Sequence, residues 1–195
     1  MFHPYVFVGL GNPGEKYLLN RHNVGFLSID AVARFYDAGR YVEKYQGQLS
    51  EITFNNKAIL LFKPMTYMNL SGQAVGSLMR FYKIPLNHLY VVHDDLNLVP
   101  GRIKVKVGGS HGGHNGLASI DQYMGADYTR VRIGIGHPGH RDGVSCYVLS
   151  NFSKNDQNWL ESMLWTLGKT LPSLIGCDTA KWLNSYTLAV RELET

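Results

Sequence analysis

Cysteine is scarce in this sequence of 195 residues, which contains only Cys146 and Cys177. Two widely separated cysteines provide neither a disulfide framework nor the ligand spacing of a zinc finger. No apolar run approaches the roughly 18–20 residues that are needed to span a bilayer. The N-terminal residues lack the basic segment and the small-residue cleavage site of a secretory signal peptide. These absences predict a soluble protein of the cytoplasm.

Charged residues are also few, at 17% of the chain, whereas 45% of the residues are hydrophobic. This composition argues against global disorder, and the length suits one domain with a substantial core. The formal net charge is +4, and residues 101–141 contain six basic and two acidic side chains, which is itself an excess of +4. A charge of this size does not by itself identify an anionic partner, but its concentration in one glycine-rich segment is notable.

Short hydrophobic strands and amphipathic helices alternate along the chain. Expected strands cover residues 5–10, 49–54, 58–62, 89–93, 102–107 and 131–135, with a last fragment at 147–149. Expected helices cover residues 24–36, 71–82, 117–124, 153–171 and 181–193, with Asn23 and Ser153 as N-caps. This order predicts an α/β fold, in which residues 1–195 form a single domain. It would have a twisted mixed β-sheet with helices on both faces, and the C-terminal helices from about residue 153 would pack on it.

A glycine motif follows the first strand, because Gly9-Leu-Gly11-Asn-Pro-Gly14 matches the dinucleotide pattern G-x-G-x-x-G. In that pattern the helix opens inside the glycines, so that its N-terminal amides meet the pyrophosphate. Here a proline interrupts the loop, and the helical pattern begins only near Asn23. Asp30, the acid at the expected spacing, falls inside a helix rather than at a strand end. We therefore interpret the motif as a tight turn and disfavour a dinucleotide-dependent oxidoreductase.

Four loops that follow predicted strands are rich in Asn, His and Gly. Ligands of open α/β sheets bind at the carboxyl ends of the strands, so several of these loops are expected to converge there. The loops cover residues 11–23, 64–72, 93–100 and 108–116, and their polar side chains include Asn12, His22, Asn23, Asn69, Asp94, Asp95, His114 and Asn115. Such a set suits the binding of a polar substrate and of a water molecule.

The chemistry that these side chains favour is activation of water. No G-x-S-x-G nucleophile motif is present, and neither cysteine lies in a recognisable catalytic setting. A histidine with a carboxylate on its other ring nitrogen can act as a general base near neutral pH. His22 and Asp94 fit these roles, although an isolated histidine is more often a surface or hydrogen-bonded residue.

Metal binding is a competing interpretation of the same residue types. Asp94 and Asp95 could bind a cation or simply cap a turn, and two loops contain His-x-x-His pairs, at 111–114 and at 137–140. Neither pair has a convincing third and fourth ligand, so we expect no metal and no other cofactor.

The basic segment contains two alternating strands. Lys104 and Lys106 share one strand face, and Arg130 and Arg132 share another. These faces could simply be solvated, but the glycine-rich loops between them would allow a backbone to approach. Contact with phosphate groups is the hypothesis that we favour. Two aromatic side chains on neighbouring loops are candidates for stacking on a base or a sugar: Tyr17 and Tyr67.

Five segments of the sequence resemble signature motifs of the bacterial peptidyl-tRNA hydrolase family. They occur in order between residues 5 and 152, and the residue before Arg21 is Asn20 where the family commonly has Thr. The segments are Val8–Gly14 with Tyr17 and Arg21–Gly25, Lys63–Gly72, His93–Gly101, Gly108–Gly116 and Arg130–Gly139.

The resemblance implies a monomeric, metal-independent esterase that cleaves the ester between a peptide and the 3′ ribose of tRNA. By this analogy His22 is the general base, Asp94 orients it, and Asn12 favours substrates whose α-nitrogen is acylated. Asn69 and Asn115 would hold the substrate and the water, and His114 would support Asn115 or the substrate. Tyr17 and Tyr67 would contact the 3′ end of the tRNA, with Lys106 and Arg132 on the 5′-phosphate of the acceptor stem. A non-catalytic RNA-binding module on the same fold is the alternative, which would need the basic face but no histidine–carboxylate pair.

Overall fold

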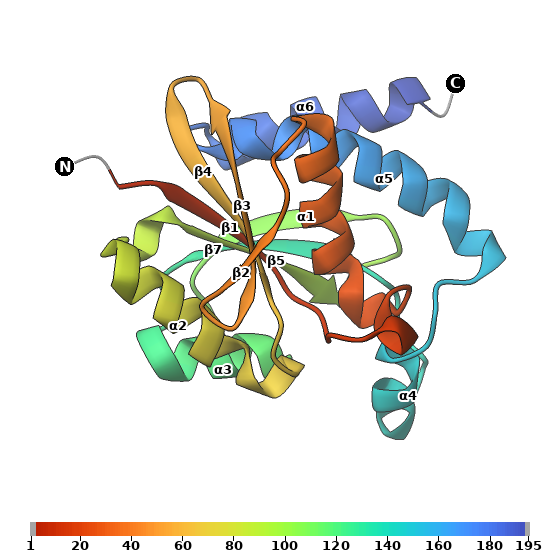
Figure 1. The fold of residues 1–195 in the computed structure, drawn as a ribbon. Coiled ribbons are helices and arrows are strands. Elements are labelled where there is room, and N and C mark those ends of the chain that lie inside the picture. Colours follow the sequence, from red (N-terminus) through yellow and green to blue (C-terminus); the bar gives the residue numbers. More distant parts are fainter. Residues whose placement is uncertain (1–2, 194–195) are drawn as a thin grey trace.

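One mixed sheet forms the centre of the protein in the computed structural model, which describes residues 3–193 (Figure 1). Within these residues seven strands pair in the order β2-β3-β4-β1-β5-β7-β6. The central pairs β4–β1, β1–β5 and β5–β7 are parallel, and the pairs toward both edges are antiparallel. The strands are β1 (Tyr5–Gly9), β2 (Val42–Lys44), β3 (Gly47–Phe54), β4 (Lys57–Pro64), β5 (Leu89–Asp95), β6 (Ile103–Val107) and β7 (Thr129–Gly134). The predicted mixed sheet is confirmed.

Helices cover both faces of this sheet, as the sequence predicts (Figure 1). Helices α2 and α3 pack together on one face, α1 and α5 pack on the other, and α6 contacts α5 and β6. The helices are α1 (Val24–Phe35), α2 (Ser71–Tyr82), α3 (Asn115–Met124), α4 (Val144–Val148), α5 (Gln157–Thr170) and α6 (Thr179–Leu193). No helix of residues 3–193 has the length and apolarity that crossing a membrane requires.

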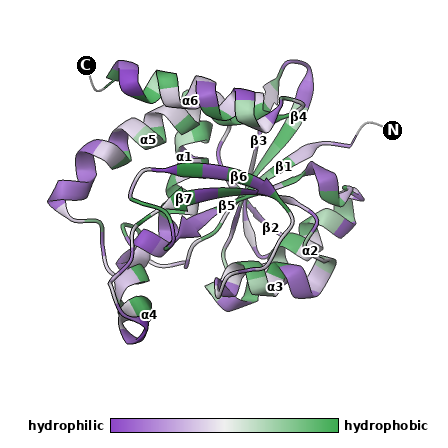
Figure 2. Ribbon diagram, turned by 180° about the vertical axis from the view of Figure 1, so that it is seen from behind, coloured by the Kyte–Doolittle hydropathy of each residue, from purple (hydrophilic) through white to green (hydrophobic). Residues whose placement is uncertain are grey.

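Alternation along the strands divides the apolar residues between two cores. On β1, Val6 and Val8 face the core under α2 and α3, whereas Phe7 faces the core under α1 and α5. Hydrophobic residues accordingly concentrate on the strands and on the helix sides that meet them, with hydrophilic residues outside (Figure 2). The period of two in a strand thus places successive side chains in different cores.

The first glycine motif serves close packing between β1 and α1. A Cβ atom on Gly9 would lie only 2.2 Å from the carbonyl oxygen of Gly25, and one on Gly25 would lie 2.4 Å from the Leu10 backbone nitrogen. Neither position therefore tolerates a side chain without movement of the backbone. Helix α1 begins at Val24, well beyond Gly14, so its N-terminal amides do not lie within the glycine loop. This arrangement agrees with the interpretation of the motif as a turn rather than a dinucleotide site.

Two local expectations differ from the structure. Residues 147–149 were expected as a strand, but residues Val144–Val148 form α4. A short apolar run fits a strand or a buried helical turn equally well, and here Tyr147 docks the helix by donating its hydroxyl to the Ile135 carbonyl oxygen at 2.6 Å. The edge strand β2 was not expected, because its three exposed residues show no apolar alternation.

Candidate active site

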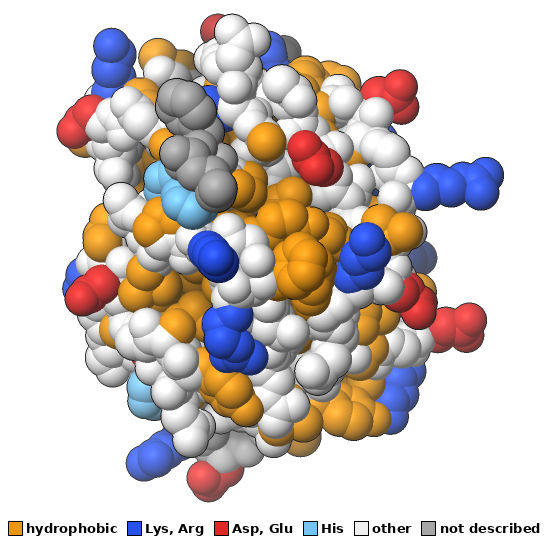
Figure 3. All heavy atoms as spheres, turned by 60° about the vertical axis from the view of Figure 1, so that its left-hand side comes forward, with side chains coloured by type: hydrophobic (Ala, Val, Ile, Leu, Met, Phe, Trp, Pro, Cys, Tyr) orange, Lys and Arg blue, Asp and Glu red, His pale blue; other side chains and the backbone are white. Residues whose placement is uncertain are grey.

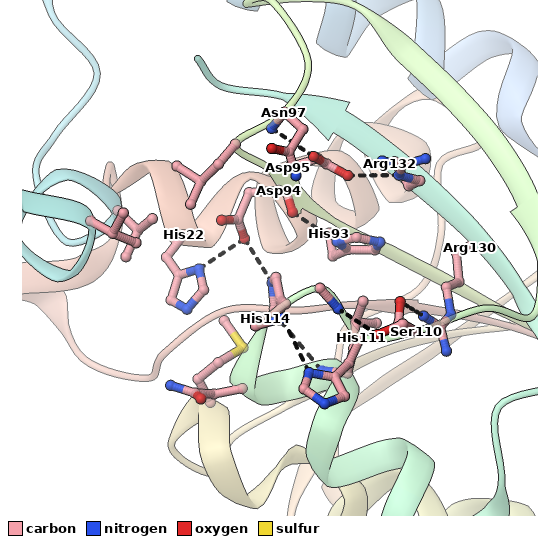
Figure 4. A pocket seen from close by; sticks show the side chains of 18 of the residues that line it. His22, His93, Asp94, Asp95, Asn97, Ser110, His111, His114, Arg130 and Arg132 are labelled. Atoms are coloured by element: carbon pink, nitrogen blue, oxygen red, sulfur yellow. Dashed lines mark hydrogen bonds and ion pairs between the residues drawn. The ribbon is translucent and has the colours of Figure 1, made fainter. Parts of the chain in front are cut away.

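A cleft of about 1050 Å³ opens where the loops after β1, β4 and β5 meet. These loops bring Asn12 and His22, Tyr67 and Asn69, and the Asp94–Asp95 pair to the same space. The loop after β6 reaches the cleft as well, through residues 108–113 and through His114 at the start of α3. The convergence that the strand order predicts is therefore present, and Figure 4 shows the arrangement from close by.

His22 and Asp94 form a buried pair at the centre of the cleft (Figure 4). His22 lies in a short 3-10 turn, Arg21–Asn23, directly before α1, and Asp94 lies near the end of β5. The distance between His22 Nδ1 and Asp94 Oδ1 is 2.8 Å. Because a carboxylate only accepts, Nδ1 carries the hydrogen, and Nε2 of a neutral His22 keeps its lone pair.

The pair shifts the pKa values of both groups. Burial lowers the pKa of His22, but the charge of Asp94 and its hydrogen bond outweigh burial, so this pKa lies above the usual 6.5. Burial raises the pKa of Asp94, but the two histidines beside it outweigh that effect and hold its pKa well below the usual 3.8. At neutral pH Asp94 is therefore an anion that favours the imidazolium form of His22.

His114 is the second histidine on the same carboxylate oxygen. Its Nε2 lies 2.9 Å from Asp94 Oδ1, and its Nδ1 accepts from the backbone N–H groups of Gly116 and Leu117 at 3.1 and 3.4 Å. Since Nδ1 accepts hydrogen bonds, it carries no hydrogen, and His114 is the neutral tautomer with its hydrogen on Nε2. The imidazole therefore acts as the N-cap of α3 and as a donor to Asp94 at once.

Among the residues that the structure describes, His22, Asp94 and His114 form a cluster in which a metal ion could bind. Their candidate ligand atoms lie within 4.8 Å of one another. However, His22 Nδ1 and His114 Nε2 donate hydrogen bonds to Asp94 and would have to lose their hydrogens to bind a cation. The hydrogen bonds account for the arrangement without an ion.

Asn12 is held by a reciprocal pairing with Asn23. The Asn12 backbone N–H donates to Asn23 Oδ1 at 2.9 Å, and Asn23 Nδ2 donates to the Asn12 carbonyl oxygen at 3.0 Å. Asn23 was expected to cap α1, but its side chain makes no cap hydrogen bond because this pairing occupies it. Asn12 Oδ1 accepts from the Met68 backbone N–H at 2.8 Å, so Asn12 lines the cleft with its Nδ2 as the remaining donor.

The other predicted substrate residues lie at the mouth of the cleft, with one exception. Asn69, Asn115 and the exposed Tyr67 line it. Tyr17 does not line it; this residue lies in the 3-10 turn Glu15–Tyr17, with the Lys16 ammonium 4.8 Å from its ring centroid.

The basic side chains of β6 and β7 share one face of the sheet. In the antiparallel register Lys104 lies opposite Arg132 and Lys106 lies opposite Arg130. The two arginines are already paired, because Arg132 Nε lies 2.6 Å from Asp95 Oδ2 and Arg130 forms an ion pair with Asp121. Lys106 and Arg132 both line the cleft.

Arg130 differs from its neighbours because it is only 2% exposed. It donates to the Ser110 carbonyl oxygen at 2.7 Å as well as to Asp121, and so attaches the loop of residues 108–113 to α3. The Arg130 guanidinium is therefore buried and paired, unlike that of a solvated basic face. On the side of the molecule in Figure 3, Lys and Arg side chains are interspersed with apolar and neutral ones rather than joined in one patch.

Sequence reasoning missed two parts of the cleft. His93 is buried beside His114, and burial lowers its pKa to about 3, with a smaller contribution from His114. Its position in a hydrophobic strand directly before Asp94 was the available signal. The other missed part is a wall from α4 and the residue after it, lined by Val144, Ser145, Val148 and Leu149. The incorrect strand assignment of residues 147–149 concealed that wall.

The fold and the cleft define a class of protein: an α/β enzyme with a buried histidine–carboxylate pair in a polar cleft. Comparison with known proteins gives the family. Residues 6–193 match the sequence profile of the family described as peptidyl-tRNA hydrolase. The chain belongs to the peptidyl-tRNA hydrolase family.

Individual relatives agree with this assignment. The chain is 49% identical over 183 residues to a peptidyl-tRNA hydrolase of Ruegeria pomeroyi, which covers 94% of this chain and 77% of that protein. It is 48% identical over 186 residues to one of Cereibacter sphaeroides, covering 95% of this chain and 83% of that protein. The crystal structure of peptidyl-tRNA hydrolase from Acinetobacter baumannii is similar, with a TM-score of 0.83, 35% identity and 94% of each chain covered.

Proposed function

We propose that this enzyme hydrolyses the ester between a peptide and the 3′ ribose of tRNA by attack of water, with His22 as general base. The observation that carries the mechanism is the 2.8 Å hydrogen bond from His22 Nδ1 to Asp94, which leaves Nε2 free to accept a proton. Family membership supports the reaction and does not favour the non-catalytic RNA-binding alternative. The products are the free peptide and a tRNA available again for translation.

The proposed steps need only water as a co-reactant. His22 Nε2 takes a proton as the water oxygen attacks the ester carbonyl carbon, and Asp94 stabilises the imidazolium that forms. The tetrahedral intermediate then expels the ribose 3′ oxygen, which receives the proton from His22. Asn69 and Asn115 at the mouth of the cleft hold the substrate and the water, and amide donors stabilise the oxyanion.

Asn12 supplies the proposed selectivity for an acylated α-nitrogen. Its Oδ1 is occupied by the Met68 backbone, so it offers an N–H donor to the cleft. A peptide carbonyl oxygen accepts from that donor, whereas the ammonium of an unblocked aminoacyl-tRNA is itself a donor and leaves Asn12 unpaired. The buried polar group then penalises the wrong substrate.

The assay that tests the proposed function compares an N-acetylaminoacyl-tRNA with the same aminoacyl-tRNA without the acetyl group, both in excess EDTA. We expect rapid release of the acetylated amino acid and at least about 10²-fold slower release of the free one, because a missing hydrogen bond at a buried polar site costs this much or more. Release of neither, or much faster release when EDTA is omitted, would contradict the proposal.

The pH dependence follows from the raised pKa of His22. The protonated imidazole cannot accept a proton from water, so kcat/KM rises with pH as His22 loses its proton and then levels off. Because the pKa lies above 6.5, the half-maximal value is expected above pH 6.5. A pH series of initial rates on the N-acetylated substrate measures it, and a midpoint well below 6.5 would argue against His22 as the base.

Lys106 and Arg132 are proposed to bind the 5′-phosphate of the acceptor stem. Both line the cleft on the same sheet face, and Arg132 keeps guanidinium donors beyond the Nε that contacts Asp95. Phosphate contacts carry little sequence information, so the enzyme is expected to accept many tRNAs. We also propose that it acts as a monomer in the cytoplasm, as the resemblance to the family implies.

Replacing Lys106 and Arg132 together by alanine should raise KM for tRNA substrates and leave KM for a short ester mimic unchanged. The slope of log Kd for tRNA against log salt concentration should fall by about 2, one for each lost phosphate contact. Lys104→Ala is a matched control, since Lys104 is exposed on the same strand but does not line the cleft. An equal loss on both substrates would rule out the phosphate assignment.

A further inference from the structure

The turn that carries His22 is attached to the segment between α4 and α5. Residues 19–21 and residues 150–152 pair through an isolated antiparallel β-bridge between Asn20 and Asn151. The Asn20 side-chain amide donates to Asn151 Oδ1 at 2.6 Å. Two backbone hydrogen bonds of 3.0 Å flank the bridge, from Arg21 N to Ser150 O and from Phe152 N to Leu19 O. Asn20, the departure from the family pattern, thus takes part in this attachment.

The side chain of Arg21 makes the most contacts across this junction. Its Nη1 donates to Ser150 Oγ at 2.8 Å, and its Nη2 donates to Asp156 Oδ2 at 2.9 Å. The guanidinium carbon lies 4.7 Å from the ring centroid of Tyr147 and 5.5 Å from that of Phe152. The Arg21 and Asp156 side chains are only 11% and 18% exposed, so water screens their ion pair little. The planar guanidinium donates two hydrogen bonds and also lies against two aromatic rings, and the ammonium of a lysine cannot reproduce this combination.

The contacts of Arg21 reach three separate elements. Tyr147 belongs to α4, whose Val144 and Val148 form a wall of the cleft. Asp156 leads into α5 and is itself bonded by Ser153 and by Trp159. His22 follows Arg21 directly in the same 3-10 turn. Any movement of Arg21 therefore changes the place of His22 relative to both Asp94 and the α4 wall.

We propose that Arg21 is a positioning residue for His22, holding the turn of the general base against the α4–α5 connection. Arg21 itself is not among the residues that line the cleft, and its effect on the reaction passes through His22. This inference rests on the proposed role of His22 as the base. Because a displacement of about 1 Å can cost 10²-fold in rate, loss of Arg21 lowers kcat by about 10–100-fold and changes KM little.

Three variants test this role: Arg21→Met, Arg21→Lys and the matched control Trp159→Phe. Trp159 Nε1 donates to Asp156 Oδ1 at 3.2 Å, so the control loosens the same carboxylate without touching the His22 turn. Each variant is measured for kcat and KM on an N-acetylaminoacyl-tRNA, and the His22 imidazole is titrated by ¹⁵N NMR. Thermal unfolding and circular dichroism show whether each variant is folded.

Arg21→Met is expected to lower kcat and to bring the His22 titration midpoint down toward 6.5, because contact with Asp94 weakens. Arg21→Lys should be intermediate, and Trp159→Phe should keep the kcat and midpoint of the unchanged enzyme. A folded Arg21→Met with unchanged kcat and midpoint would overturn the proposal, as would an equal loss in Trp159→Phe. If Arg21→Met does not fold, Arg21→Lys decides by the same two measurements.

The NMR readout separates this inference from the proposed function. If His22→Ala proved fully active, the general-base role would fail, yet a shifted His22 titration in Arg21→Met would still show the positioning. If His22→Ala is inactive and the His22 titration is identical with and without Arg21, only the positioning role fails.

Discussion

Replacing His22 by alanine is expected to lower kcat by about 10²–10⁴-fold, the usual contribution of a general base. The methyl side chain of alanine cannot accept a proton from water, and His114, the other histidine on the Asp94 carboxylate, has its Nδ1 occupied as the cap of α3. The acid limb of the pH profile should also disappear. Single-turnover hydrolysis of N-acetylaminoacyl-tRNA measures both effects.

The fold and the binding of tRNA should survive this change, because the proposed phosphate contacts are made by Lys106 and Arg132 and not by His22. Circular dichroism and a tRNA binding titration provide these controls. His140→Ala is the matched variant, since His140 is an exposed histidine that does not line the cleft. A folded His22→Ala protein with full activity would exclude the proposed mechanism.

Neutralising Asp94 by Asp94→Asn is the second change for which we expect a large loss, of about 10²–10⁴-fold in kcat. The amide oxygen can still accept a hydrogen bond from His22, but the charge that stabilises the imidazolium is lost, and neutralising the acid of a catalytic triad has a comparable effect. Asp127→Asn, which changes an exposed carboxylate, is the matched control.

The pH profile distinguishes this variant from His22→Ala. In the unchanged protein the Asp94 charge and hydrogen bond outweigh burial and raise the pKa of His22. Without that charge, burial predominates and the pKa falls, so the residual activity should reach half its maximum at a lower pH. An acid limb that stays in place in Asp94→Asn would mean that Asp94 does not control the His22 titration.

Local patterning predicts most of the fold. Helix α2 occupies Ser71–Tyr82 as expected, and the β3–β4 hairpin forms around its Asn-Asn turn. Prediction fails where local pattern and tertiary contact disagree, as in α4, where a short apolar run folds as a helix because Tyr147 bonds to Ile135 across the chain. The edge strand β2 forms through its pairing with β3, and the residues of β2 themselves give no strand pattern that predicts this pairing.

The site divides in the same way. Residue types and their places after strands identify the loops of His22 and Asp94, because polar side chains at the carboxyl ends of parallel strands share one edge. His114 follows the antiparallel strand β6, and only the tertiary structure shows that its loop returns to the cleft. The pattern does not reveal that His114 caps α3 while it donates to Asp94. It also does not show that Asp121 holds the buried Arg130 or that Arg21 attaches the His22 turn to the α4–α5 connection.

The sequence by itself determined the fold class, and it was enough to propose the loops of the site, the general base and its partner, because these depend on short-range pattern and residue type. Only the tertiary structure decided which atoms meet. His22 and Asp94 are 72 residues apart, and Arg21 and Asp156 are 135 apart. Tautomers, pKa shifts and the pairing of the basic residues depend on such long-range contacts. The packing of helices on the sheet brings these residues together, and no local signal in the sequence shows it.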